Sequence, residues 1–558
     1  MIAVVGAVAS LLAALPAQAQ DGGKTVGTLR IPLPRDDGTL TPYTFNVAYP
    51  LMTLVYDTLF WRRADGSPEP WLATGVRSGD LGRRLTIGLR SGVRWHDGRP
   101  VTAQDVKFTF DYFKSRYQRR FTPELSSVQR TEVVDDMTVA IHLSHPAPGF
   151  EDQPLADMPI LPKHLWEGLP RGRVPAGETI GSGPYQLVQH DPGRGYRFQA
   201  NRGYFRGPPR VETIEVPFIS DFERTVRALK QRQVDMIPAT LPRRTETEVR
   251  DPSFKIGSGD LYAGTALMFN LRRGPFNGVR ARRAVSMALD LDRVAQSAVG
   301  QDPLAFPAIR GYLHPDSGWA AGDVLHRFDE GLAHKAFREL RLPPIRILAP
   351  DNDPVKQEAG RQVVLALQRV GQAAGLETVS PAAVAAAVGE NGSSPSFDAA
   401  ILSIPALASD DPGYLSAIFG SDSRLAPLNY SGYRSERFDA LARRAARETA
   451  PGERRRVVGE ELKLLARQDI PAVALFYPKG AFAFRPQIYD GWVFVKGTGI
   501  LDKRSFLASA AGAPPAGGPP NAIAGAGGVD VLEIVAIGLL VGVVAVLALS
   551  SARQMRRG

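Results

Sequence analysis

The stretch Leu85-Thr-Ile-Gly-Leu-Arg-Ser-Gly-Val-Arg-Trp-His-Asp-Gly-Arg-Pro-Val-Thr-Ala-Gln-Asp-Val-Lys-Phe-Thr-Phe110 reads as a strand, a turn and a capped helix. Apolar residues alternate from Leu85 to Leu89, as in a strand that buries one face, and Asp97-Gly98 is a turn signal. Thr102 stands three positions before Asp105, and this spacing predicts a helix that is capped at its first turn. The stretch is therefore one local α/β unit.

Similar local patterns occur on both sides of this stretch. They predict a strand over 212–217, a helix over 222–231, a helix over 279–294 and an alanine-rich surface helix over 381–389. Because strand-like and helical runs alternate without an internal repeat, we expect α/β lobes.

Several further motifs follow in a fixed order along the chain. They are Met158-Pro-Ile-Leu-Pro162, Gly181-Ser-Gly-Pro-Tyr185, Asn201-Arg-Gly-Tyr-Phe-Arg-Gly-Pro-Pro209, Val234-Asp235, Phe269-Asn270, Pro275-Phe276, Val279-Arg280, Ala284, Ala288-Leu-Asp290, Asn429-Tyr-Ser-Gly-Tyr433 and Phe438-Asp439. Together with the opening stretch they cover roughly Leu29 to Trp492. In this order they resemble the family 5 extracellular solute-binding proteins of ABC importers, the oligopeptide, dipeptide and nickel-binding group.

The resemblance implies a two-lobed periplasmic-binding-protein-like (type II) α/β fold, with the ligand between the lobes and a hinge of crossing strands. An extra subdomain is built onto the first lobe. Mapped by the order of the motifs, lobe I takes residues 24–60, 178–262 and 484–507, the extra subdomain 61–177, and lobe II 263–483.

The N-terminal end has the pattern of a secretory signal. Ile2 to Leu15 is apolar or small, too short to span a membrane, and is followed by Pro16-Ala17-Gln18-Ala19, so residues 1–19 are predicted to be a cleaved signal peptide. No Lys or Arg precedes the apolar run, which leaves open a true start upstream of Met1. A buried N-terminal helix is the alternative interpretation.

The C-terminal end has the pattern of a membrane anchor. Ile534 to Ser551 carries no charge and is followed by arginines at 553, 556 and 557, so we expect a transmembrane helix over 531–552 and a cytoplasmic tail over 553–558. A cleaved sorting tail is the alternative. Residues 508–528, rich in Ala, Gly and Pro, are predicted to be a flexible linker. The soluble part is then extracytoplasmic and held at the cell membrane by a single pass.

The amino-acid composition excludes several classes of protein. The chain has 558 residues, a net charge of +10 and no cysteine. The absence of cysteine excludes disulfides, thiolate metal sites, a cysteine nucleophile and a lipid-modified N-terminal cysteine. Because the arginines are spread along the chain and no aromatic-basic motif accompanies them, we expect no nucleic-acid partner.

The resemblance also implies where a ligand is held. Relatives that bind peptides bond the extended main chain and anchor its ammonium group with an aspartate in lobe II, and Asp410 and Asp411 occupy the matching region. A solvated turn is the alternative interpretation of Asp-Asp-Pro. Further lining candidates are Tyr43, Tyr49, Tyr56, Tyr262 and Asn270, each with packing as its alternative.

No catalytic or metal-binding pattern is present in the sequence. The resemblance implies that His96, which could suggest a metal ligand or a base, belongs to a structural turn far from the cleft. His142 and His145 lie near a strand end, where their spacing does not place two imidazoles on one helical face. Zinc-protease, phosphate-loop and nucleophile-elbow motifs are absent. The sequence therefore predicts a protein without enzymatic activity, catalytic residues, metal or cofactor.

Two hypotheses about function follow. The first is a monomeric, membrane-tethered solute-binding protein that captures a peptide or similar small solute by hinge closure and delivers it to an ABC permease and its ATPase. The second is a membrane-held ligand sensor or envelope interaction module that keeps the fold without transport. An enzyme such as a cell-wall peptide hydrolase ranks third.

Overall fold

The computed structural model describes residues 25–43, 48–170, 173–175, 179–238, 241–242, 245, 249, 252–300, 305–320, 322–390, 392–404 and 410–507. The chain divides into two units, residues 1–508 and 509–558, and the first contains all of the described part. The predicted signal peptide (1–19), the linker (508–528), the transmembrane helix (531–552) and the cytoplasmic tail (553–558) lie outside it. Among the described helices, none is both long enough and apolar enough to span a bilayer.

The strands of the described chain form four sheets. They are β1 (Val26–Arg30), β2 (Phe60–Arg62), β3 (Pro68–Pro70), β4 (Ala73–Gly79), β5 (Arg84–Leu89), β6 (Val128–Asp135), β7 (Thr138–Leu143), β8 (Tyr185–Asp191), β9 (Gly195–Ala200), β10 (Val211–Pro217), β11 (Met236–Ile237), β12 (Lys255–Asp260), β13 (Gly264–Phe269), β14 (Ala305–Pro307), β15 (Ile345–Pro350), β16 (Ala374–Val379), β17 (Ala399–Ile404) and β18 (Ala472–Phe484). Two four-stranded sheets have the orders β1-β10-β9-β8 and β4-β5-β7-β6, and β2 pairs with β3. The largest has the order β11-β18-β13-β17-β15-β16, with β12 and β14 also paired to β18.

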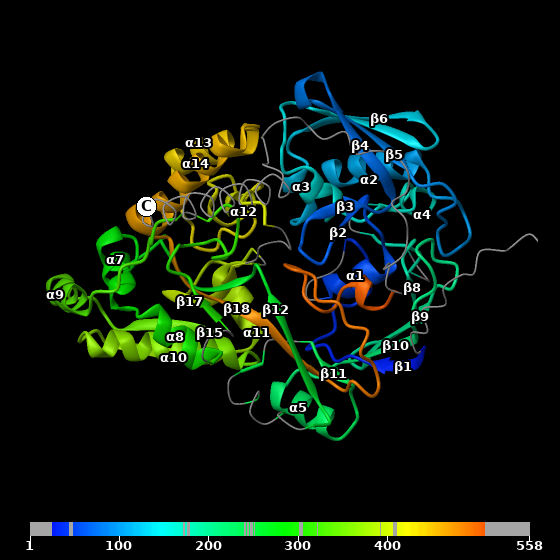
Figure 1. Cartoon of the computed structure of the whole chain (residues 1–558). Coiled ribbons are helices and arrows are strands. Elements are labelled where there is room, and N and C mark those ends of the chain that lie inside the picture. Colours follow the sequence, from blue (N-terminus) through cyan, green and yellow to red (C-terminus); the bar gives the residue numbers. More distant parts are fainter. Residues whose placement is uncertain are drawn as a thin grey trace, which may run out of the picture. The chain divides into compact units, whose positions relative to one another are not determined.

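Helices cover these sheets. They are α1 (Tyr49–Val55), α2 (Ala103–Ser115), α3 (Phe121–Glu124), α4 (Lys163–Trp166), α5 (Phe222–Lys230), α7 (Val279–Ala288), α8 (Leu291–Ala298), α9 (Glu330–Leu340), α10 (Pro354–Arg369), α11 (Pro381–Val388), α12 (Tyr414–Phe419), α13 (Glu436–Arg447) and α14 (Pro451–Lys463). Short 3₁₀ turns occupy Asp80–Gly82 and Lys503–Ser505, and wider turns occupy Glu151–Leu155 and Leu464–Asp469. Helices α8 and α10 pack on the sheet formed by β15, β16, β17 and β18 (Figure 1).

The unit predicted from the opening stretch is confirmed. Strand β5 lies between β4 and β7, and α2 begins with a capping box in which Asp105 Oδ2 accepts the Thr102 backbone N–H at 2.9 Å. The other oxygen of Asp105 accepts the backbone N–H of Lys163 at 2.9 Å. The cap of one helix therefore also fixes the start of α4.

His96 lies in a structural turn, as expected from the sequence. Its Nε2 contacts Gly183 O at 3.0 Å, and its Nδ1 accepts the Gly181 N–H at 3.2 Å. A Cβ at Gly181 would lie 1.9 Å from Val55 O, so only glycine permits this approach to α1. Burial lowers the pKa of His96, which keeps the imidazole neutral in this structural role.

The other predicted elements are confirmed with one correction. The strand over 212–217 is β10, the helix over 222–231 is α5, and the alanine-rich helix is α11, which ends at Gly389 with a φ of 85°. The single helix predicted over 279–294 is wrong because the chain breaks between α7 and α8. Asp290 accepts the Arg293 N–H at 3.1 Å and starts a new helix, an interaction that competes with continuation of the first.

Strand β18 connects the two halves of the described unit. Its first residues pair with β13, while Lys479 to Phe484 pair with β12 (Figure 1). The side chain of Tyr477 belongs to one of the second-lobe cores, and that of Phe482 belongs to the first-lobe core. The paired strands β12–β13 and β18 thus form the crossing between lobes.

The first lobe is closed by the last described segment of the chain. Lys503 Nζ lies 2.6 Å from Asp57 Oδ1, and both side chains are fully buried. Asp57 also accepts hydrogen bonds from Trp71 Nε1 and the Tyr204 hydroxyl, each at 2.9 Å. Because a buried charge is costly unless paired, the C-terminal segment is part of the lobe's core.

Candidate functional site

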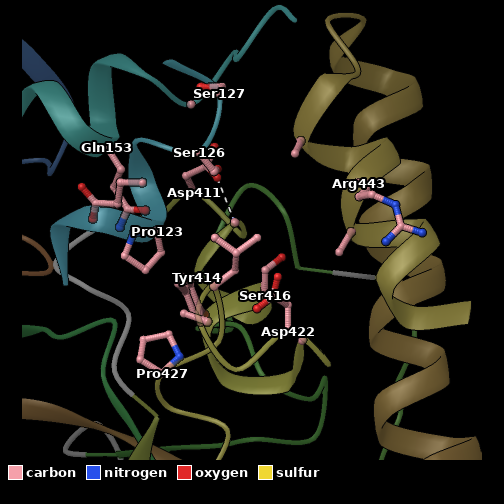
Figure 2. A pocket seen from close by; sticks show the side chains of 18 of the residues that line it. Pro123, Ser126, Ser127, Gln153, Asp411, Tyr414, Ser416, Asp422, Pro427 and Arg443 are labelled. Atoms are coloured by element: carbon pink, nitrogen blue, oxygen red, sulfur yellow. Dashed lines mark hydrogen bonds between the residues drawn. The ribbon is translucent and has the colours of Figure 1, made fainter. Parts of the chain in front are cut away.

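A cavity of about 1220 Å³ lies between the segment assigned to the extra subdomain and the segment assigned to lobe II. One wall is formed by α3 with its flanking residues and by residues 144–153. The other wall is formed by α12, α13 and α14 (Figure 2). This volume suits a small solute rather than a single ion.

The subdomain wall contains a buried charge network. Arg120 donates to both oxygens of Asp157 at 2.6 Å, and the Tyr49 hydroxyl donates to the same carboxylate at 2.7 Å. Burial and the neighbouring Asp157 charge raise the pKa of Glu124 well above its usual range, so Glu124 is neutral beside Asp157. Burial opposes ionisation of Asp157 as well, but Arg120 outweighs it and lowers that pKa. The charge of Asp157 is therefore paired within this network, whereas both oxygens of Glu124 have no hydrogen-bond partner among the described residues.

The lobe II wall is organised by Asp411. Its carboxylate binds Arg454 Nη2 at 2.7 and 2.9 Å and accepts the Gly413 backbone N–H at 2.8 Å. Arg454 in turn donates to Ala445 O at 2.9 Å, and its guanidinium lies 4.6 Å from the centre of the Trp319 ring. Asp411 is thus a largely buried helix-anchoring residue at the cavity surface.

The two walls touch at two places. A Cβ at Gly149 would lie 2.6 Å from Asp411 Oδ2, so the subdomain backbone rests against this carboxylate. Arg119 forms an ion pair with Glu390 and donates to the Tyr430 hydroxyl at 2.7 Å. The cavity is therefore bounded by polar contacts that separation of the walls would break.

The surroundings of Asp410 differ from those of Asp411. Burial raises its pKa, while hydrogen bonds from Ser317 and the Gly318 N–H act in the opposite direction. The Lys496 ammonium lies 5.5 Å from the centre of the Tyr262 ring. Burial, followed by the charge of Asp410, raises the pKa of the Tyr262 hydroxyl. Asp410, Tyr262 and Lys496 form a second polar cluster, contributed by both lobes.

The remaining ligand-binding candidates predicted from the sequence lie at the cavity, in the subdomain network or in a buried core. Tyr43 lines the cavity, and its hydroxyl donates to Tyr117 O at 3.2 Å. Tyr49 is bound within the subdomain network. Tyr56 is 2% exposed in the first-lobe core, and Asn270 is buried, donating to Phe397 O at 3.0 Å. The structure brings Tyr43 and Asp411 to one cavity, and Asp410 and Tyr262 to one cluster.

Sequence reasoning missed several groups at the cavity, above all Glu461. This acid lies on the buried side of α14, among Val457, Val458 and Leu462. An acidic residue within an otherwise apolar helical stripe is a readable signal of an unusual environment. No group of three or more His, Cys, Asp or Glu arranged to hold a metal occurs in the part of the chain that the structure describes.

Residues 67–425 match the profile of bacterial extracellular solute-binding proteins, family 5, in its middle part. The chain belongs to this family. The resemblance inferred from the motifs is thereby confirmed. Family members bind solutes and are generally not enzymes.

The curated relatives match this chain over part of their length. A protein of Agrobacterium fabrum named as a probable peptide-binding protein, YejA, is 26% identical over 389 residues, which cover 62% of this chain and 60% of the relative. Curated relatives match over 40% to 60% of their own length in the cases of highest similarity.

Two solved structures share the fold. The oligopeptide-binding protein AppA of Bacillus subtilis, in complex with a nonapeptide, has a TM-score of 0.76 at 20% identity, covering 87% of this chain and 100% of AppA. NikZ from Campylobacter jejuni, in complex with Ni(L-His), has a TM-score of 0.73 at 22% identity, covering 82% and 94%. These likenesses confirm the two-lobed periplasmic-binding-protein-like α/β fold.

Proposed function

We propose that this chain is a membrane-tethered extracytoplasmic solute-binding protein that captures a peptide or similar small solute and delivers it to an ABC-type importer. The main support is the cavity, which has one wall from the extra subdomain and one from lobe II; the walls meet through Gly149–Asp411 and Arg119–Glu390. A solute that contacts both walls would favour the closed arrangement, since only that arrangement offers both sets of contacts.

The proposal assigns a part to each segment of the chain. After removal of residues 1–19, lobe I (24–60, 178–262, 484–507), the extra subdomain (61–177) and lobe II (263–483) form the receptor. Residues 508–528 are the linker, 531–552 the single-pass anchor and 553–558 the cytoplasmic tail. The linker keeps the monomeric receptor near its permease and ATPase, which raises their effective concentration.

The candidate residues have separate roles in this proposal. Asp411 acts indirectly, because it holds Arg454 and meets Gly149 on closure. Asp410 and Tyr262 contact the solute in the interlobe space beside Lys496, and Tyr43 contacts it from lobe I. The solute leaves chemically unchanged, and no cofactor takes part.

Native mass spectrometry of the freshly purified full chain in mild detergent tests the proposal. We expect co-purified peptides that are released intact, and a melting temperature that rises when they are added back. Recovery of chemically altered solute would contradict capture without conversion, and a sugar as the only bound solute would contradict the peptide assignment.

A further inference from the structure

The acidic side chains around the cavity differ in what they already bind. Six line the described part of it: Glu124, Glu390, Asp411, Asp422, Asp439 and Glu461. Asp422 accepts the Arg424 N–H at 2.8 Å, Asp439 accepts the Ser421 N–H at 3.0 Å, and Glu390 pairs with Arg119. Asp411 pairs with Arg454. Among the described residues, Glu124 and Glu461 are the two of these six that form no ion pair and have buried oxygens without a hydrogen-bond partner; Glu124 lies beside the paired Asp157, and Glu461 is the one on the lobe II wall.

Glu461 is buried as well as unpaired. Its side chain is 3% exposed, and its Oε1 has no hydrogen-bond partner among the described residues. A buried polar atom without a partner costs about 1–3 kcal/mol, so its persistence at a cavity wall calls for a ligand partner. Arg454, on the same helix, does not supply that partner because its Nη2 is bonded to Asp411.

The charges near Glu461 favour its protonated form. Burial raises its pKa to about 8; Arg454 acts against this rise, and Asp411 adds to it. On the adjacent helix α13, Arg443 and Arg447 line the same cavity. At neutral pH the side chain of Glu461 is therefore a neutral carboxylic acid, which avoids an unpaired charge in a buried position.

From this arrangement we propose that Glu461 is the group that recognises an ammonium group of the solute, and that capture expels the carboxyl proton into solvent. This inference rests on the proposed function and names the chemistry of its site. In the step, the O–H bond of Glu461 breaks, the proton leaves to water, and the carboxylate accepts an N–H from the solute ammonium. One neutral acid and one cation become an ion pair plus a released proton.

Proton release has a measurable signature in the unaltered full chain. We use alanine peptides of three to five residues and the same peptides with an N-acetyl group. Calorimetry at pH 6.5 in two buffers of different ionisation enthalpy should give about one proton released per free peptide. Affinity for the free peptides should rise by up to about tenfold per pH unit from pH 6 and level off near pH 8, where Glu461 and the peptide amine both titrate.

A matched pair of variants locates the effect. Glu461→Gln keeps the shape and neutrality of the protonated side chain, and should bind free peptides at least about tenfold more weakly at pH 7.5, with no proton release. Glu460→Gln makes the same change one residue earlier, at an exposed side chain paired with Arg456, and should leave affinity and proton release as in the unaltered chain.

The outcomes separate this inference from the proposed function. If free and acetylated peptides bind equally well and without proton release, the role of Glu461 is wrong while peptide capture stands. Equal binding by Glu461→Gln and the unaltered chain has the same meaning. If neither set of peptides binds the unaltered chain, peptide capture fails, and the role of Glu461 fails with it.

Discussion

The two walls of the cavity place their buried acidic side chains in different surroundings. On the subdomain wall, Asp157 is bonded by Arg120 and Tyr49, and Glu124 lies beside it in its neutral form. On the lobe II wall, Asp411 is bonded to Arg454, but Glu461 stays unpaired a few turns further along α14. The neutral acid of the subdomain wall thus lies against a paired aspartate, whereas the neutral acid of the lobe II wall lies among the apolar side chains of α14.

This difference suggests that the subdomain wall contributes mainly to stability and the lobe II wall mainly to solute binding. The network of the subdomain wall fixes its shape, because removal of Arg120 leaves the buried charge of Asp157 without its main compensation. The lobe II wall leaves a polar group whose partner the solute supplies. We therefore expect substitutions on the subdomain wall to affect stability first, and substitutions on the lobe II wall to affect binding first.

The largest effect is expected on the subdomain wall. Arg120→Met leaves Asp157 buried without its main counter-charge and should lower the free energy of unfolding by about 3–5 kcal/mol. Urea denaturation of the full chain measures this change. Arg130→Met removes an exposed arginine paired with Glu132 and should cost less than about 1 kcal/mol. Equal losses in the two variants would remove the contrast between buried and exposed pairs.

The next effect concerns contact between the walls. Gly149→Ala places a methyl group 2.6 Å from Asp411 Oδ2, and the carboxylate cannot yield easily because it holds Arg454. Closure should become less favourable by about 1–3 kcal/mol, which weakens solute affinity roughly 5- to 150-fold while thermal stability without solute changes little. Gly168→Ala, with no atom within 4 Å, is the matched control. Unchanged affinity in Gly149→Ala would show that the walls do not meet in the bound state.

The third effect is a pH dependence of stability that is spread over several pH units. The pKa of Glu461 is about 8 in the folded chain, against an ordinary value of 4.5. Between these values the folded chain binds the proton more tightly than the unfolded chain, so its stability falls as pH rises, by at most about 1.4 kcal/mol per pH unit. Glu461→Gln should lose this slope and become the more stable variant near pH 8. Parallel curves from pH 5 to 8 would contradict a buried neutral acid.

The smallest effect is expected at the second contact between the walls. Arg119→Gln removes the ion pair with Glu390, where both side chains are partly exposed to solvent. Water and salt screen such a pair, so we expect affinity to fall about two- to fivefold, with the difference shrinking at high salt. Titration calorimetry at 50 and 500 mM salt measures this. A loss above about twentyfold would instead assign Arg119 a direct contact with the solute.

Much of the fold was predictable because its signals are local. The capping spacing of Thr102 and Asp105 fixed the start of α2, and the alternation at Leu85–Leu89 gave β5. The break between α7 and α8 was missed because apolar spacing continues through it, whereas the cap formed by Asp290 competes only once both helices pack.

The site was predictable only in part. The resemblance pointed to Asp410 and Asp411. It could not show that these two adjacent side chains have different surroundings, because their directions depend on how the turn folds. Glu461 carried a signal in its apolar surroundings, yet helical periodicity shows burial and not which cavity lies beyond. Pairing of Asp157 with Arg120 joins residues 37 positions apart and has no local sequence signal.

The buried pair of Asp57 and Lys503 has a consequence for the order of assembly. The two residues are 446 positions apart, so the first lobe stays without its final core segment until nearly the whole chain has been made. At typical synthesis rates this delay is roughly 20 to 90 s. During that time Asp57 lacks its partner Lys503, and β12 lacks its pairing with β18. The lobe that the ribosome begins first is therefore the last to be completed.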